Sequence, residues 1–504
     1  MRLSPEATIG LLNEVERRFA VADWTMGSIR VWPIVRAAVW WTVNANFAQQ
    51  RVRLQSENRL LRRARQATQL PQDWARAGIA RFAQADRHAD IRRPADVVIL
   101  GDNVSRIPLE GFWYDRLCQP FVEELDSLGV TTLHLEPNHL YRGPRANASV
   151  RIQPRLDALW IRSRVSVQTP AESLPGYDEF LRVLRDRTSA SAGMELDELR
   201  RQVAYLLLTA RWFERVLATV RPRLVMNVDL GIVQMALHLA CRRAGITSVE
   251  IQHGAVRENH AFFSAWADLP PQGFELLPAV YWVWGEQEAG MIRQWSAATS
   301  PRHRPIIGGN LWLQRWVHGG NELVDRFDAR VRSLRAPGPD GVNVLVALST
   351  GVTSERDLRA VRDGIVHSPE GWRWWIRRHP TMAANELRQV EGLLGESERV
   401  IFDAPSTLPL YALLRGADVH VTQRSSVVEE AAAFGVPTVI TEAAAAASTF
   451  KPEIESGWAV IAEDGPALLA GITTQLGRRP ELPPVTTGGP RSPRDLLGDL
   501  LAGS

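Results

Sequence analysis

The sequence predicts an α/β protein built from two doubly wound, Rossmann-like domains that face each other across a cleft. Short apolar runs, typical of buried parallel strands, alternate with longer segments of helical periodicity through most of the chain. Many of these runs end in polar or glycine-containing loops, as strands do at the ligand-binding edge of an open α/β sheet. The 504 residues suffice for two such domains and exceed what one usually needs.

The first 93 residues are predicted to form a helical extension. Its segment 24–47 is rich in tryptophan, with Trp24, Trp32, Trp40 and Trp41. Residues 51–93 are rich in arginine. Aromatic apolar faces beside a basic stretch are typical of helices that lie in a membrane interface. The alternative is that the tryptophans pack against the next domain and the arginines coat a solvated helix.

Residues 94–320 are predicted to form the first α/β domain. Strands are expected at 96–101, 131–135, 223–228, 247–251, 280–284 and 305–307. Helices are expected at 114–128, 195–220 and 231–244. Residues 136–193, rich in proline and arginine, fit no clear element.

Residues 321–478 are predicted to form the second α/β domain. A strong turn signal at 335–341 precedes its first strand. Strands are expected at 342–348, 372–376, 400–402, 417–421 and 438–440, with helices near 355–365, 383–394 and 408–414. Residues 479–504, rich in proline and glycine, are predicted to be a loosely ordered tail.

In the first domain, His253 is the leading candidate for catalysis. It follows a β-branched strand in the sequence Gln252-His253-Gly254. An imidazole with a pKa near neutrality suits the removal of a proton from a hydroxyl. The carboxylates that compete for this role are Glu250, Asp229 and Asp102, and a hydrogen-bonded structural histidine is the alternative interpretation. Ser105 and Arg106 follow the first strand together with Asp102 and are expected on the same side of the sheet.

In the second domain, several residues suit a phosphate. Arg378 and His379 end one strand, and Ser425 and Ser426 precede a helix after another. Helix N-termini and cationic side chains favour phosphate. Glu430, one turn into that helix, could accept hydrogen bonds from ribose hydroxyls. The alternatives are a surface histidine in a basic turn, helix capping by the serines and dipole complementation by the glutamate.

Other classes of site are not expected. Cys118 and Cys241 show no C-x-x-C spacing, and His253 and His260 lack the helical spacing of metal ligands, so neither a disulfide, a metal nor a cofactor is predicted. No phosphate-binding P-loop or nucleophile elbow occurs. The arginines are balanced by acidic residues, which disfavours nucleic acid. With no long apolar stretch and an N-terminus containing acidic residues, we expect a cytoplasmic protein.

The ordered set of motifs resembles the GT-B glycosyltransferases of bacterial surface polysaccharide assembly, such as capsule polysaccharide, polysialic acid and teichoic acid polymerase-like enzymes. The segments that carry the resemblance are Gln252-His253-Gly254, Gly308-Gly309-Asn310, Arg378-His379-Pro380, Ser425–Ala431 and Gly435-Val436-Pro437.

The resemblance implies metal-independent transfer of a sugar from a nucleotide-activated donor to a hydroxyl of a growing or lipid-linked glycan. It places the donor on Thr350, Gly351, Arg378, His379, Ser425, Ser426 and Glu430. His253 would be the base or an acceptor-side residue, and the other residues expected on the acceptor side are Asp102, Ser105, Arg106 and Gln252. A peripheral position on the inner face of the cytoplasmic membrane is compatible with the resemblance. Two alternatives stay open: a nucleotide-sugar epimerase of the same fold, and a non-catalytic scaffold that binds glycan or membrane.

Overall fold

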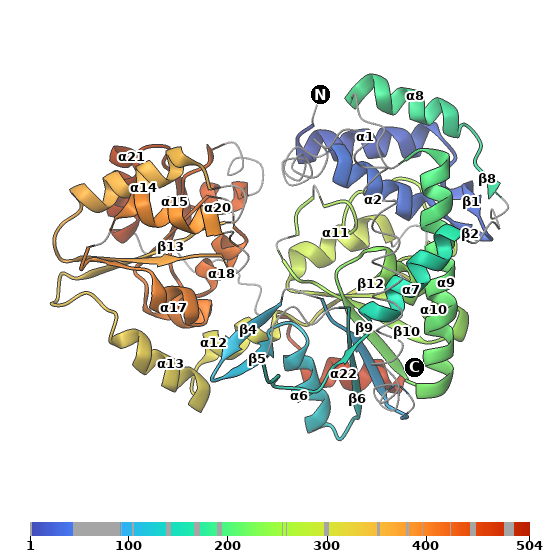
Figure 1. Cartoon of the computed structure of the whole chain (residues 1–504), viewed down its shortest axis with the longest axis horizontal. Helices are drawn as coiled ribbons and strands as arrows, with labels where there is room; N and C mark the ends of the chain where they lie inside the picture. Colours follow the sequence, from blue (N-terminus) through green and yellow to red (C-terminus); the bar gives the residue numbers. More distant parts are fainter. Residues whose placement is uncertain are drawn as a thin grey trace. The chain divides into compact units, whose positions relative to one another are not determined.

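The computed structural model divides the chain into two compact units, each described here by itself (Figure 1). Unit 1 comprises Met1–Arg106, Tyr114–Asn310 and Gly488–Ser504, and unit 2 comprises Ile107–Trp113 and Leu311–Thr487. The residues that the structure describes are 3–43, 91, 93–102, 105–137, 143–165, 172–188, 194–254, 256–258, 260–296, 302–349, 353–379, 382, 384–395, 397–423, 425–443, 450–477 and 488–503.

Unit 1 is organised around a seven-stranded parallel sheet with the order β12-β11-β10-β9-β3-β6-β7. The strands are β3 (Val97–Leu100), β6 (Thr132–Glu136), β7 (Val150–Arg151), β9 (Leu224–Val228), β10 (Thr247–Ile251), β11 (Val280–Val283) and β12 (Arg304–Ile307). The chain starts in the middle at β3, runs out through β6 and β7, and returns to β9 on the other side of β3. This reversal defines a doubly wound sheet, with its topological switch point between β3 and β9.

Helices cover both faces of this sheet, which explains why its central strands β3 and β9 are buried along their whole length and do not alternate between buried and exposed residues. On one face α9 (Leu196–Val220) packs beside α10 (Ile232–Ala244) and α7 (Gln153–Val165). On the other, α6 (Gln119–Ser127) packs against β6 and against α22 (Pro493–Ala502) (Figure 1). A residue with left-handed backbone conformation follows each of these two helices, Arg221 after α9 and Gly245 after α10.

The N-terminal segment packs into the core of unit 1. It contains α1 (Pro5–Arg18), α2 (Trp32–Val43) and an antiparallel sheet of β1 (Thr25–Met26), β2 (Ile29–Arg30) and β8 (Glu172–Ser173). Trp24 and Trp32 are fully buried and Trp40 nearly so, while Trp41 is 38% exposed. These positions agree with the packing alternative for the three buried tryptophans, and the expected arginine-rich stretch falls mostly outside the described residues. No helix in the described part of the chain combines the length and apolarity needed to cross a membrane.

Unit 2 has a six-stranded parallel sheet with the order β15-β14-β13-β16-β17-β18. The strands are β13 (Val342–Ala347), β14 (Trp372–Arg377), β15 (Val400–Ile401), β16 (Val419–Thr422), β17 (Thr438–Ile440) and β18 (Ala459–Ile461). Helices α14 (Glu355–His367), α15 (Ala384–Leu394) and α21 (Gly465–Leu476) cover one face, and α13 (Glu322–Arg332) and α17 (Leu410–Gly416) cover the other (Figure 1). The switch point lies between β13 and β16. The predicted fold class, with two doubly wound parallel sheets, is confirmed.

Local predictions failed in two places, and one stretch left unassigned proved to contain regular elements. The helix expected at 114–128 begins only with α6, because the residues before it form a hairpin of β4 (Arg106–Leu109) and β5 (Phe112–Asp115) around the left-handed pair Glu110-Gly111. The tail expected to be loose contains α22, whose four buried leucines pack it onto unit 1. The unassigned stretch 136–193 contains β7, α7 and α8 (Tyr177–Thr188).

Candidate functional site

In unit 1 the candidate polar residues gather at one edge of the sheet. Asp102, Asp229 and His253 follow the carboxyl ends of β3, β9 and β10, which are neighbours in the order β3-β9-β10. Neighbouring strands lie about 4.8 Å apart, so these loops emerge within roughly 10 Å of one another. This edge contains the switch point, where ligands bind in doubly wound sheets.

Asp229 occupies a strained backbone position at this edge. Its φ of 68° is left-handed, which is unusual for a residue other than glycine. The conformation is held locally, because Asp229 Oδ1 accepts a hydrogen bond from Leu230 N at 2.7 Å and Asn227 Nδ2 donates to the Asp229 carbonyl at 2.8 Å. The result is an exposed carboxylate next to the switch point. Strain of this kind is concentrated at functional sites.

Glu250 lies one strand away from Asp229 but in a different environment. Its side chain is buried in β10, and burial raises the pKa of its carboxyl well above the ordinary value, with a further contribution from the charge of Asp229. Glu250 therefore favours its neutral, protonated form. His253, two residues past the end of β10, is exposed. The edge thus offers an acid, a carboxylate and an imidazole.

Two expected acceptor-side residues have structural roles. The Gln252 amide accepts from Trp284 N at 2.9 Å and donates to Gly254 O at 2.9 Å, which fastens its loop to the end of β11. The Arg106 guanidinium is buried against Glu136, with Nε donating to Oε1 at 2.6 Å. Both side chains are directed into the protein by these partners, so neither prediction of a ligand contact is supported by the geometry.

Asp102 and Ser105 form a local turn at the end of β3. Asp102 Oδ1 accepts from Ser105 N at 2.8 Å and from the Ser105 hydroxyl. This Asx-type arrangement orders the start of the loop, and Ser105 is buried while Asp102 is partly exposed. Of the pair, Asp102 is the better placed for a ligand.

A pocket lies beside the same edge of unit 1. It is lined by apolar side chains of α2 and α10, including Trp41 of α2, by Trp160 of α7, and by Gly231, which immediately precedes α10. Two arginines and a glutamate also line it: the Arg164 guanidinium lies 4.1 Å from the Trp160 ring centroid, and Arg201 forms an ion pair with Glu198 at 2.8 Å. Because Leu230 and Gly231 follow Asp229 directly, the pocket adjoins the switch point. Apolar walls with a few charged groups are typical of small-molecule sites, and no motif in the sequence indicated this one.

In unit 2 the candidate residues again follow three adjacent strands. Arg378 and His379 follow β14, Ser349 lies two residues past β13, and Ser425 lies three residues past β16. The strand order β14-β13-β16 and the parallel registers place these loops at one edge, spanning about 10 Å. Thr350 and Gly351, expected beside them, lie outside the described residues.

Gln423 lies at this edge, and no sequence pattern predicted a role for it. It directly follows β16 and is fully buried. Its Oε1 accepts from Ser349 N at 3.2 Å and from Thr353 Oγ1 at 3.4 Å, which ties the loop after β13 to the loop after β16. Its Nε2 has no hydrogen-bond partner among the described residues. A buried amide donor left over at a switch point is available to a ligand. A glutamine in a polar loop carries no distinctive sequence pattern, so only the fold identifies it.

Arg378 is engaged inside unit 2. Its Nη1 and Nη2 each lie 2.7 Å from a carboxylate, of Glu391 and Asp403, and its Nε donates to Ser406 Oγ at 3.1 Å. This is a different role from the phosphate contact expected from the sequence, since the two carboxylates already compensate the charge. Arg378 instead fixes the loop that carries His379, which is exposed.

The segment before α18 (Val427–Ala433) differs from the expected capping pattern. Ser426 occupies the N-cap position with helical φ and ψ and makes no side-chain cap. The hydroxyl of Ser425 instead accepts weakly from Val427 N, at 3.4 Å. Glu430 is buried, and its Oε1 accepts from the Tyr411 hydroxyl at 2.8 Å. Any ribose contact of Glu430 would share its carboxylate with Tyr411.

The fold and these two edges define a protein with two Rossmann-type units, each carrying polar residues at its switch point. No protein-family model matches the chain, and no curated protein matches its sequence. Among solved structures, the chain is similar to the UDP-GlcNAc 2-epimerase from Neisseria meningitidis bound to UDP-GlcNAc, with 12% identity, a TM-score of 0.49 and coverage of 81% of this chain and 100% of that one.

It is also similar to MurG from Acinetobacter baumannii, with 12% identity, a TM-score of 0.43 and coverage of 81% of this chain and 100% of the other. A third similar structure is a calicheamicin glycosyltransferase, with 14% identity, a TM-score of 0.41 and coverage of 77% and 91%. Similarities of this strength assign no activity. The fold class given above therefore depends on the strand order of the chain itself.

Proposed function

We propose that this protein is a glycosyltransferase that moves a sugar from a nucleotide-activated donor to a hydroxyl of a glycan or lipid-linked glycan. One observation carries the proposal: in each unit, polar residues stand at the carboxyl ends of three adjacent strands that include the switch point. Two such edges suit a reaction with two substrates, because donor and acceptor each need a binding surface.

The donor is assigned to unit 2. The Ser425 hydroxyl, the Gln423 amide and the His379 ring would contact the nucleotide and its phosphates. The Arg378 guanidinium, held by Glu391 and Asp403, would act by positioning the loop of His379. Stabilising the negative charge that develops on the leaving phosphate is the main requirement for breaking the sugar–phosphate bond.

The acceptor is assigned to unit 1. His253 or Asp229 would take the proton of the acceptor hydroxyl as its oxygen forms a bond to the anomeric carbon. The bond between that carbon and the phosphate oxygen breaks, and the nucleotide leaves with the electron pair. The pocket lined by Trp41, Trp160 and Arg164 offers apolar and cationic surface to an acceptor that has both a lipid or sugar face and an anionic group.

The first test of this proposal is a thermal-shift screen of the full chain against CMP, CDP, UDP, GDP and dTDP. A nucleotide present at about 100 times its Kd stabilises the folded state by about 2.7 kcal/mol, which is visible as a raised Tm. Gln423→Leu should abolish the shift for the nucleotide that works, whereas Ser456→Ala, an exposed position on unit 2, should retain it. A chain that responds to none of the five nucleotides would refute the assignment of the donor.

The second test concerns transfer. With a donor identified, His253→Ala and Asp229→Asn should each lower turnover by about 100-fold or more, as expected for loss of general-base catalysis. His367→Ala, an exposed histidine on α14, is the matched control. Wild-type turnover in both His253→Ala and Asp229→Asn would exclude this edge from the chemistry.

A nucleotide-sugar epimerase is a second candidate, favoured by the pair Asp229 and Glu250. An exposed carboxylate beside a carboxyl group with a raised pKa is the arrangement expected of a base and an acid that act on one substrate. Incubation with the donor alone separates the two functions. An isomerised sugar nucleotide indicates the epimerase. A donor that stays unchanged alone and is consumed only after an acceptor is added indicates the transferase.

A further inference from the structure

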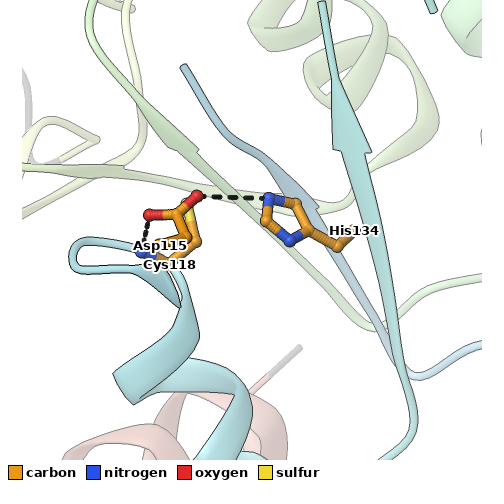
Figure 2. Close-up of side chains that lie close together, drawn as sticks. All are labelled: Asp115, Cys118 and His134. Atoms are coloured by element: carbon orange, nitrogen blue, oxygen red, sulfur yellow. Dashed lines mark hydrogen bonds and ion pairs between the residues drawn. The ribbon is translucent and has the colours of Figure 1, made fainter. Parts of the chain in front are cut away.

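Three side chains with metal-binding groups converge in unit 1 behind the end of β3 (Figure 2). Asp115 ends β5, Cys118 immediately precedes α6, and His134 lies in β6. One ligand atom of each, the Asp115 carboxylate oxygen, Cys118 Sγ and a His134 ring nitrogen, lies within 4.8 Å of the other two. All three residues are buried, with side chains no more than 2% exposed for Asp115 and His134.

The space among these atoms is kept by Gly101, the residue that follows β3. A Cβ atom added there would lie 2.7 Å from His134 Nε2, 3.4 Å from Asp115 Oδ2 and 3.4 Å from Cys118 Sγ. Any side chain at position 101 would therefore enter the middle of the group. Because residue 101 is glycine, no side-chain atom of that residue occupies this position within 3.4 Å of all three ligand atoms.

The hydrogen bonds of Asp115 leave one oxygen directed at this space. Oδ1 accepts from Leu117 N at 3.0 Å and from Cys118 N at 2.8 Å, which fixes the carboxylate. Oδ2 is buried, accepts no hydrogen bond from the described residues and lies 3.7 Å from His134 Nε2, too far for a hydrogen bond. A buried carboxylate oxygen in this state is costly unless a cation compensates it.

His134 is oriented from its other nitrogen. Its Nδ1 lies 2.7 Å from the side-chain amide of Asn147, so Nε2 is directed toward Asp115. Outer-sphere hydrogen bonds of this kind orient histidine ligands in metal sites. Coordination through Nε2 requires that Nδ1 carries the proton. When the Asn147 side-chain amide is rotated by about 180°, its oxygen can accept a hydrogen bond from this Nδ1–H group.

Charge balance also favours a divalent ion. A divalent ion would bind the thiolate and the carboxylate, together with a neutral imidazole, as an uncharged group. Thiolate, imidazole and carboxylate are the donors that Zn²⁺ takes, at about 2.0–2.3 Å, usually with four ligands.

We propose that Asp115, Cys118 and His134 bind one Zn²⁺ ion through Oδ2, Sγ and Nε2, with the fourth position left to water or another ligand. Binding forms three coordination bonds and releases to solvent the thiol proton of Cys118 together with any proton on the Asp115 carboxyl. The site is separate from the proposed sugar transfer and does not depend on it.

The test is zinc uptake by the full-length protein without an affinity tag, reduced, stripped with a chelator and dialysed against Zn²⁺. Elemental analysis should find one equivalent in the wild type. Loading with Co²⁺ instead should give the thiolate-to-cobalt charge-transfer band that marks a cysteine ligand. Cys118→Ser should lose both the bound metal and the band.

Cys241→Ser is the matched control, because Cys241 is the other buried cysteine and lies on α10 away from this group. It should bind metal like the wild type. Asp115→Asn can preserve the hydrogen bonds accepted by Oδ1 and should bind at least ten times more weakly, and Gly101→Ala should exclude the ion by filling its space. Circular dichroism verifies that each variant is folded.

A wild-type protein that retains no zinc after dialysis would overturn the proposal. So would equal retention by folded Cys118→Ser or Gly101→Ala protein, since either result would place the ion elsewhere.

Discussion

A buried ion pair joins the N-terminal helices to the rest of unit 1 and gives a sharp prediction of stability. Arg36 of α2 is fully buried and contacts the carboxylate of Glu16 in α1, which also accepts from Trp32 Nε1 at 2.7 Å. The guanidinium donates to three carbonyls of one later segment: Ala261 at 2.8 Å, Ser264 at 3.2 Å and Ala265 at 3.1 Å. Arg36 therefore connects two helices to the loop that follows the candidate residue His253.

The variant Arg36→Met keeps apolar bulk and removes every one of these donors. It leaves the Glu16 carboxylate buried without its cation, and breaking a buried pair from one side costs about 3–5 kcal/mol. That loss is a large share of the roughly 5–15 kcal/mol by which folded proteins are stable. Urea unfolding followed by tryptophan fluorescence measures the change, because several tryptophans are buried nearby.

The control is Arg18→Met, which removes an ion pair with Glu179 whose side chains are 48% and 45% exposed. An exposed pair contributes about 0–1 kcal/mol. If Arg36→Met were no less stable than Arg18→Met, the inference that this buried pair stabilises the packing of the N-terminal helices in unit 1 would be refuted.

Two further predictions concern acid and packing. Burial lowers the pKa of four histidines, to about 3 or about 4 (His238, His260, His303 and His420). Because the unfolded chain binds these protons near pH 6.5 and the folded chain does not, stability should be lost as the pH falls below about 6.5. His420→Gln should reduce the loss of unfolding free energy between pH 7 and 5.5 by about 1 kcal/mol. The control His367→Gln, at an exposed position, should not reduce it. An equal pH dependence of stability in the two variants would contradict this prediction. Gly308→Ala should destabilise unit 1 by about 1–3 kcal/mol, because the new methyl group would overlap the Trp282 ring. Gly254→Ala should melt like the wild type, because no atom of the described residues other than its chain neighbours lies within 4 Å of its Cβ position. Similar melting of the two glycine variants would be the contrary result.

The motifs located the candidate edges better than they assigned individual roles. Asp229, His253, His379 and Ser425 all follow strands that the sequence predicted, and the sheet order brings them to two edges. Arg378 and Gln252 were expected to contact ligands, and their side chains instead form ion pairs or hydrogen bonds with protein groups. A side chain at a strand end can be directed toward solvent or toward the protein. The choice depends on partners such as Glu391 and Trp284, which lie far away in the sequence and only come close in the fold.

The sequence by itself determined the fold class, since apolar strands that alternate with amphipathic helices can bury their surfaces only as covered parallel sheets. The tertiary structure alone decided which loops are neighbours, because strand order is set by long-range pairing and not by local pattern. It identified Gln423 between two loops of unit 2 and brought Asp115, Cys118 and His134 together around Gly101. The spacing of those three residues matches no metal-binding motif, because their ligand geometry is created by a hairpin, a helix start and a strand that meet only in space.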